Sequence, residues 1–197
     1  VSYGFFYDGL PDISSGVSDV VNLDTCKSDA GNLQGRLSWV LEPQGLTCFG
    51  YDEMGRQNLR QRVIYKGKGV RSGEFVESVG RSSFSAAGSL LTESFEDGFK
   101  AYPQYDRAGR LTAVKGEGEV PFWSVIAPPG GGGGMDAAGR VLAEKYGNGV
   151  IETYQRDVLG MPKDIQITRP TGVGGAGAPE TIFHTSILRN LYGAPTS

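Results

Sequence analysis

Short runs of alternating apolar and polar residues, separated by turn-forming residues, make up most of this 197-residue chain. The run at 36–42, Arg-Leu-Ser-Trp-Val-Leu-Glu, alternates as a half-buried strand does. The runs at 141–146 and 150–155 are joined through Asn148 and Gly149, and Asn-Gly between two such runs is a strong hairpin signal. The pattern therefore predicts an all-β, antiparallel chain. Strands are expected at 2–7, 36–42, 46–51, 61–66, 74–79, 100–105, 111–114, 122–127, 141–146, 150–155, 163–168 and 181–188.

Three segments need a separate interpretation. The segment 82–95 alternates around Gly88 and predicts a hairpin, with a short helix at 86–93 as the alternative. The segments 128–134 and 171–179 are rich in Gly and Pro, and we expect both to be loops between strands. A phosphate-binding loop is a poor interpretation of 128–134, because no Gly-Lys-Ser/Thr follows the glycines.

A six-residue turn signature recurs along the chain, in which an Asp or Asn lies three residues before a Gly. Full copies begin at Tyr51, Tyr105 and Met135, and weaker copies begin at Arg156 and Arg189. Self-similarity of this kind indicates a chain built from one repeated unit. Each copy predicts a strand, a turn of three to five residues, and a returning strand.

The residue types of the signature have a physical reason. The Asp side chain accepts hydrogen bonds from backbone N–H groups a few residues later, and the Gly supplies the positive φ that ends such a turn. The following Arg packs its stem on the outgoing strand, while its head meets water or the Asp. The predicted turn residues are Tyr51, Asp52, Gly55, Arg56, Tyr105, Asp106, Gly109, Arg110, Asp136, Gly139, Arg140, Asn148, Gly149, Asp157 and Gly160.

Composition narrows the function classes further. The 31 glycines favour turns over helices, and a net charge of -3 gives no reason to expect a nucleic-acid partner. No apolar run approaches the roughly 18 residues that a membrane span needs, so we expect no membrane span. The sequence also contains no stretch typical of a signal peptide at its start.

Few residues offer catalytic or metal-binding chemistry. Cys26 and Cys48 flank the first predicted hairpin, and two interpretations stay open, a disulfide or two separate thiols. His184 is the only histidine, and it has no evident nucleophile or metal-ligand partners. The repeated Asp residues indicate one turn role used several times. The sequence therefore predicts no enzyme activity, no cofactor and no metal, although a small hydrolase centred on His184 is a third hypothesis.

The signatures carry a resemblance to a known family. The segment 105–112, Tyr-Asp-Arg-Ala-Gly-Arg-Leu-Thr, resembles the YD repeat of RHS proteins, and the segment 135–150 is similar to it. The segment 122–125, Phe-Trp-Ser-Val, lies ahead of an Asp turn and resembles sequence in the B and C components of Tc toxin complexes. The late copies depart from the pattern, since Met135, Arg156 and Arg189 replace Tyr. The chain also has no Asp-Pro, so the family's self-cleavage signature is absent from this sequence.

The resemblance implies that residues 1–197 form a segment of a long antiparallel ribbon of hairpins, which winds into part of a hollow shell. It further implies a non-catalytic role in a secreted or cell-surface toxin complex, in which the shell encapsulates a toxic C-terminal polypeptide and helps to deliver it. The expected partners are adjoining RHS repeats and the enclosed polypeptide. The alternative is a surface-exposed adhesion or carbohydrate-binding module, with Trp39 and Trp123 as candidate sugar platforms.

Overall fold

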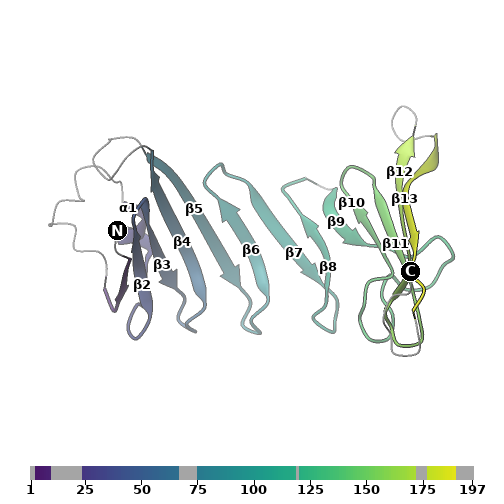
Figure 1. Cartoon of the computed structure of the whole chain (residues 1–197). Coiled ribbons are helices and arrows are strands. Elements are labelled where there is room, and N and C mark those ends of the chain that lie inside the picture. The colour runs from purple at the N-terminus through teal and green to yellow at the C-terminus, as the bar shows by residue number, and fades with distance from the viewer. Residues whose placement is uncertain (1–2, 10–23, 67–74, 119, 172–176, 190–197) are drawn as a thin grey trace. The chain divides into compact units, whose positions relative to one another are not determined.

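The structure is a computed structural model that describes residues 3–9, 24–66, 75–118, 120–171 and 177–189. Within these ranges it contains thirteen strands and one short helix (Figure 1). In chain order the elements are β1 Gly4–Tyr7, α1 Asp24–Asp29, β2 Leu37–Glu42, β3 Gly45–Tyr51, β4 Gln57–Tyr65, β5 Phe75–Phe84, β6 Leu90–Phe95, β7 Lys100–Tyr105, β8 Leu111–Lys115, β9 Pro121–Val125, β10 Ala143–Tyr146, β11 Ile151–Arg156, β12 Pro162–Thr171 and β13 Gly177–Ser186.

Each strand pairs antiparallel with the next strand in the sequence, so the order in the sheet is the order along the chain, β1 to β13. The prediction of an all-β antiparallel hairpin fold is confirmed. The chain forms two compact units, Val1–Ala101 and Tyr102–Ser197, whose boundary falls within β7.

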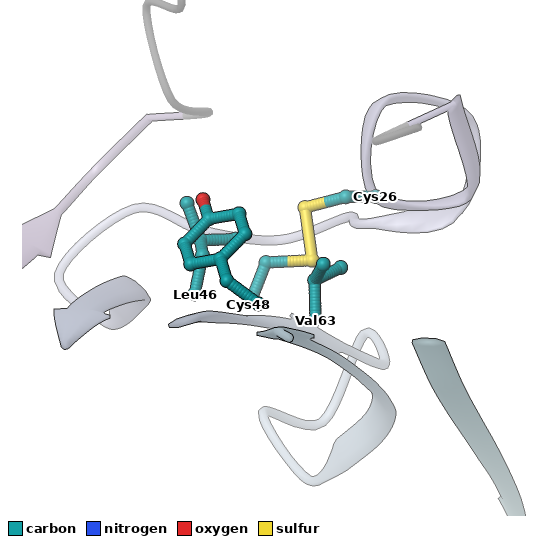
Figure 2. Close-up of a cluster of buried hydrophobic side chains, with 5 residues drawn as sticks. Cys26, Leu46, Cys48 and Val63 are labelled. Carbon is teal, nitrogen blue, oxygen red and sulfur yellow. A yellow bond between two sulfur atoms is a disulfide. The ribbon is translucent and has the colours of Figure 1, made fainter. Parts of the chain in front are cut away.

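The first unit packs its core on one face of the sheet. Alternate residues of β4, Leu59 to Tyr65, are buried, since side chains of a strand point to opposite faces in turn. The core cluster consists of Cys26, Leu46, Cys48, Val63 and Tyr65, with the two cysteines and Val63 fully buried (Figure 2).

Helix α1 covers this face, and the sequence pattern gave no indication of it. The sulfur atoms of Cys26 and Cys48 are bonded to each other, which ties α1 to β3 (Figure 2). Arg81 Nη2 lies 2.6 Å from Asp29 Oδ2, so an ion pair also joins the end of α1 to β5. Six residues are too few for a stable isolated helix, so these tertiary contacts hold α1 in place.

One face of the second unit carries aromatic, aliphatic and acidic side chains. Cross-strand register puts Trp123 opposite Tyr146, and Glu152 opposite Ile167, on one face. The other face is polar near the end of the chain, where Gln166 lies opposite His184.

The structure decides or corrects several local predictions. The hairpin interpretation of 82–95 is confirmed, because β5 and β6 pair there and 86–93 contains no helix. The loop expected at 171–179 is wrong at both ends. Thr171 belongs to β12 and pairs with Gly177, and residues 177–179 belong to β13, whereas residues 172–176 lie outside the described ranges. The turn copy at 190–193 lies outside the described residues.

Candidate functional site

The candidate site of this chain is its repeated turn, which the stretch Asp52–Arg56 shows in full. The Asp52 N–H donates to the Arg56 carbonyl and the Gly55 N–H donates to the Asp52 carbonyl, both at 2.9 Å. The Asp52 Oδ1 accepts the N–H groups of Met54 and Arg56 at 2.9 Å. Its Oδ2 accepts Arg56 Nε at 2.6 Å. One carboxylate thus closes the turn and fixes the first side chain of the outgoing strand.

Two further turns repeat this arrangement in the second unit. In Asp106–Arg110 the two backbone bonds measure 3.0 Å, and the Asp106 Oδ1 accepts Ala108 and Arg110 N–H groups at 2.9 Å. In Asp136–Arg140 the corresponding four bonds measure 2.9 Å. In both turns Arg Nε donates to Asp Oδ2 at 2.7 Å. The glycines have positive φ, +81° at Gly55, +78° at Gly109 and +80° at Gly139, which favours Gly there.

The electrostatics of the turns follow from these bonds. The Arg110 backbone N–H, and after it the Arg110 guanidinium, holds the pKa of Asp106 below its ordinary value. The Arg140 backbone N–H likewise lowers the pKa of Asp136, whereas desolvation of this carboxylate acts in the opposite direction. Each Asp is therefore engaged as an anion within its own turn, which is the chemistry of a structural carboxylate.

A fourth turn, Asp157–Met161, keeps the backbone pattern but lacks an Arg at its end. The Asp157 Oδ1 accepts the Leu159 and Met161 N–H groups at 2.9 Å, and Gly160 has φ +78°. Arg189, from after β13, places its Nε 3.9 Å from Asp157 Oδ2. A residue far along the chain thus takes the place of the missing turn arginine.

Other hairpins use the same backbone turn without the Asp. In Ser85–Ser89 the Ser85 hydroxyl oxygen accepts the Ser89 N–H at 3.1 Å. In Tyr146–Val150 the Asn148 Oδ1 accepts the Val150 N–H at 3.1 Å, and Gly149 has φ +85°. The glycine position is therefore the common element. The side-chain acceptor is an Asp or Ser three residues before the glycine, or an Asn directly before it.

The turn arginines also reach the next turn along the same edge of their unit, a contact that the sequence analysis missed. We call Arg36, Arg56, Arg110 and Arg140 the bracket arginines. A Cβ on Gly55 would lie 3.0 Å from Arg36 Cζ, and a Cβ on Gly139 would lie 3.1 Å from Arg110 Cδ. The Arg140 guanidinium occupies the space that a side chain at Gly160 would need.

Arg56 makes the corresponding contact with the turn that has Ser85 in place of Asp. Its Nη1 donates to the Ser85 carbonyl at 2.7 Å, and its guanidinium carbon lies 4.9 Å from the centre of the Phe84 ring. Each bracket arginine therefore links two successive turns. The regular Asp-x-x-Gly-Arg spacing was the signal that could have indicated it.

The aromatic residues before the turns have different surroundings. The Tyr51 hydroxyl donates to the Leu37 carbonyl at 2.8 Å, and Arg36 lies over its ring at 5.5 Å. Burial raises the pKa of Tyr51, against the opposing charge of Arg36. Tyr105 ends β7 opposite Leu111, at a register shift beside the Asp106 turn. Both rings thus lie where a strand enters its turn.

His184 has a neighbouring carboxylate, but the arrangement is not that of an activated nucleophile. His184 Nε2 lies 2.9 Å from Asp164 Oδ2, and the Ser186 hydroxyl donates to the same oxygen at 2.6 Å. Asp164 therefore lies between the other two groups, whereas nucleophilic catalysis needs the imidazole to bond to the hydroxyl.

A cluster of aromatic and acidic side chains lies on the face of the second unit that carries Trp123 and Tyr146, and the sequence analysis did not identify it. Glu144 accepts hydrogen bonds from Trp123 Nε1 and, at 2.7 Å, from the Tyr154 hydroxyl. Glu152 lies directly opposite Glu144 on β11. Burial, followed by the bond to Glu144, raises the pKa of Tyr154. Trp123 is thus hydrogen-bonded to Glu144. Trp39 is stacked on Phe6, with ring centres 3.6 Å apart.

The described ranges contain neither a metal-binding cluster nor a membrane-spanning helix. No group of three or more His, Cys, Asp or Glu side chains there is placed to hold a metal ion. No described helix has the length and apolar character to cross a membrane.

Comparisons with known proteins give structural matches only. No protein-family model and no curated protein sequence matches the chain. Among solved structures, it is similar to the Photorhabdus luminescens Tc holotoxin pore carrying a TccC3 mutation, to TcdB2-TccC3-Cdc42, and to TcdB2-TccC3 without its hypervariable C-terminal region. Each match has 21% identity and a TM-score of 0.62.

The matches cover 83% of this chain but only 8% of the matched chains. The chain is therefore folded like a short stretch of these Tc toxin components, an antiparallel series of hairpins. This agrees with the RHS-like fold that the turn signatures predicted.

Proposed function

We propose that this chain is a structural, non-catalytic segment of an RHS-repeat shell that encapsulates a toxic C-terminal polypeptide and helps to deliver it. The observation that carries the proposal is that each bracket arginine contacts two successive turns. In the second unit the Asp turns lie at alternate connections, hence at one edge of the sheet, and in the first unit the Asp52 and Ser85 turns do the same. The bracket arginines join successive turns. Such a device holds neighbouring hairpins in a fixed register, as a continuous wall requires.

Further observations support the proposal. The repeated carboxylates are engaged in backbone turns, which leaves them a structural role. The fold is that of part of a TcdB2-TccC3 chain, and one matched structure lacks a hypervariable C-terminal region that belongs to that protein. A buried disulfide suits a secreted or cell-surface protein, because such compartments are oxidising. Adjoining repeats and the enclosed polypeptide are the partners of this proposal.

The test uses the natural protein that contains this chain. The purified particle is imaged at low resolution, and limited proteolysis is then run on the intact particle and on particles opened by mild denaturant. We expect a particle well above 21.0 kDa with an internal void, and a polypeptide that becomes cleavable only after opening.

A compact 21.0 kDa monomer would overturn the enclosure proposal and favour a surface adhesion module. Equal cleavage rates in the intact and opened particles would also contradict it, because an enclosed polypeptide is inaccessible to protease.

A further inference from the structure

A groove crosses strands β4, β5 and β6 of the first unit, on the face opposite the disulfide core. Its volume is about 440 Å³, within the ~300–1,000 Å³ typical of small-ligand sites. Cross-strand register places Arg60, Gly80 and Phe95 side by side on this face. A Cβ on Gly80 would approach only the Arg60 carbonyl oxygen, at 4.0 Å, so the glycine leaves the space between Arg60 and Phe95 open.

The groove contains one free positive charge and one free negative charge. Among the described residues, neither the Arg60 guanidinium nor the Glu93 carboxylate has a hydrogen-bond or ion-pair partner. Arg62, the next arginine on this face, is instead held by Glu42 through a 3.2 Å ion pair. Ala101, directly opposite Glu93 on β7, has no polar side-chain atom. Arg60 and Glu93 thus offer an anion site and a cation site in one groove.

An aromatic wall and two hydroxyl groups complete the lining. Phe95 is 43% exposed, and its ring lies against the Phe99 ring with the centres 5.9 Å apart. The hydroxyl groups belong to Ser78 and Ser82, on either side of Gly80 along β5. A ligand that fits this lining must carry a positive and a negative group close together, and an apolar group that packs on Phe95.

We propose that this groove binds a free amino acid with an aromatic or aliphatic side chain. Its α-carboxylate pairs with the Arg60 guanidinium, because the parallel N–H groups of arginine match the two oxygens of a carboxylate. Its α-ammonium group donates to the Glu93 carboxylate. Its side chain packs on Phe95, where burial of apolar surface adds to the affinity. The site needs only the first unit, so it goes beyond the proposed wall role and does not depend on it.

The experiment titrates the whole chain with L-phenylalanine and L-leucine, and follows binding by calorimetry and by ligand-observed NMR. Two derivatives of L-phenylalanine each lack one charge, since the methyl ester has no carboxylate and the N-acetyl form has no ammonium group. Arg60→Ala and Glu93→Gln remove the matching charges of the protein. Gly80→Val fills the groove, and valine suits a strand.

Two further variants are matched controls. Ser83→Val changes the neighbour of Ser82 on β5, which points to the other face of the sheet. Arg107→Ala removes an exposed arginine from the second unit, so it tests for an effect of net charge alone. Unfolding midpoints are measured for all variants, and Arg60→Ala and Glu93→Gln should leave them unchanged.

We expect Gly80→Val to abolish binding, and both controls to bind L-phenylalanine as the parent chain does. Arg60→Ala should weaken L-phenylalanine binding about tenfold, the loss of one charge-assisted contact. It should not weaken binding of the methyl ester, which has no carboxylate for Arg60 to hold. Glu93→Gln should likewise weaken binding of L-phenylalanine but not of its N-acetyl form.

The proposal is overturned if neither amino acid binds, or if a control variant weakens binding as much as Gly80→Val. It is also overturned if Arg60→Ala weakens binding of the ester as much as binding of the amino acid, because the lost contact would then not involve the carboxylate. None of these results depends on whether the natural particle is hollow.

Discussion

The side chain of Arg110 lies against the α-carbon of Gly139 in the next Asp turn, with its Cδ 3.1 Å from the position that a Cβ would take. Gly139 therefore meets two requirements at once, the positive φ of its own turn and room for the preceding arginine. Gly109 meets only the first, because a Cβ there would have no neighbour within 4 Å.

This difference separates the two effects in a stability experiment. Gly109→Ala should destabilise the fold by about 1–3 kcal/mol, the usual cost of an αL residue with a side chain. Gly139→Ala should cost more, because Arg110 must also move. Urea unfolding of both variants, with Gly118→Ala as the unstrained and uncrowded control, measures the difference. Equal losses at 109 and 139 would show that the bracket contact contributes nothing.

The depressed pKa of Asp106 predicts a loss of stability in acid. The Arg110 backbone N–H bond, the largest cause, stabilises the ionised form, so the folded pKa lies below the ordinary 3.8. The contribution is present above pH 3.8 and is lost as the pH falls through the folded value. Unfolding free energies between pH 6 and 2 should therefore fall less steeply for Asp106→Asn than for the parent chain.

A control for the acid experiment is Asp97→Asn, because Asp97 makes one backbone bond, to Phe99, and has no turn arginine. Parallel pH curves for the parent chain and Asp106→Asn would contradict the assigned role of the Asp106 carboxylate.

The Cys26–Cys48 bond predicts a redox-dependent stability. It closes a loop with a sequence separation of 22 residues, and loss of such a bond typically costs about 2–4 kcal/mol. The double variant Cys26→Ser and Cys48→Ser should show this loss in denaturant unfolding, together with faster hydrogen exchange in α1. A reductant should reproduce the effect in the parent chain and leave the variant unchanged. The prediction fails if α1 stays protected after the bond is removed.

Tyr154 predicts a change on the alkaline side. Burial and the bond to Glu144 raise its pKa above the ordinary 10.0, so the folded state holds this proton more tightly than the unfolded state. The resulting stability is full below pH 10.0 and is lost as the pH rises through the folded value. Tyrosinate absorbance should show fewer groups titrating near pH 10 in the folded parent chain than after unfolding, and Tyr154 is one of the missing groups.

Tyr154→Phe should reduce the difference between the folded and unfolded titrations by one group. It should also cost about 1–3 kcal/mol at neutral pH because Glu144 loses a donor. Tyr146→Phe provides the control, since its hydroxyl is 3.5 Å from Glu152 in a more exposed position. Identical titrations of the parent chain and Tyr154→Phe would contradict the assignment.

Local sequence predicts most of this fold because the turns are local. Asp52, Gly55 and Arg56 lie within five residues and make their bonds with one another, so their spacing alone indicates a turn. Helix α1 could not be predicted in this way, since its six residues show no apolar period and are held by Cys48 and Arg81. The contact of Glu144 with Trp123 and Tyr154 depends on the register of three strands, which only the folded sheet sets.

The sequential strand order has a consequence for folding and for length. Backbone pairing joins each strand only to its neighbours in the sequence, so most strand pairs have low sequence separation. Folding can then start at any hairpin and spread one strand at a time. For the same reason, a chain of this kind can gain or lose a whole repeat by duplication or deletion while the remaining hairpins keep their neighbours.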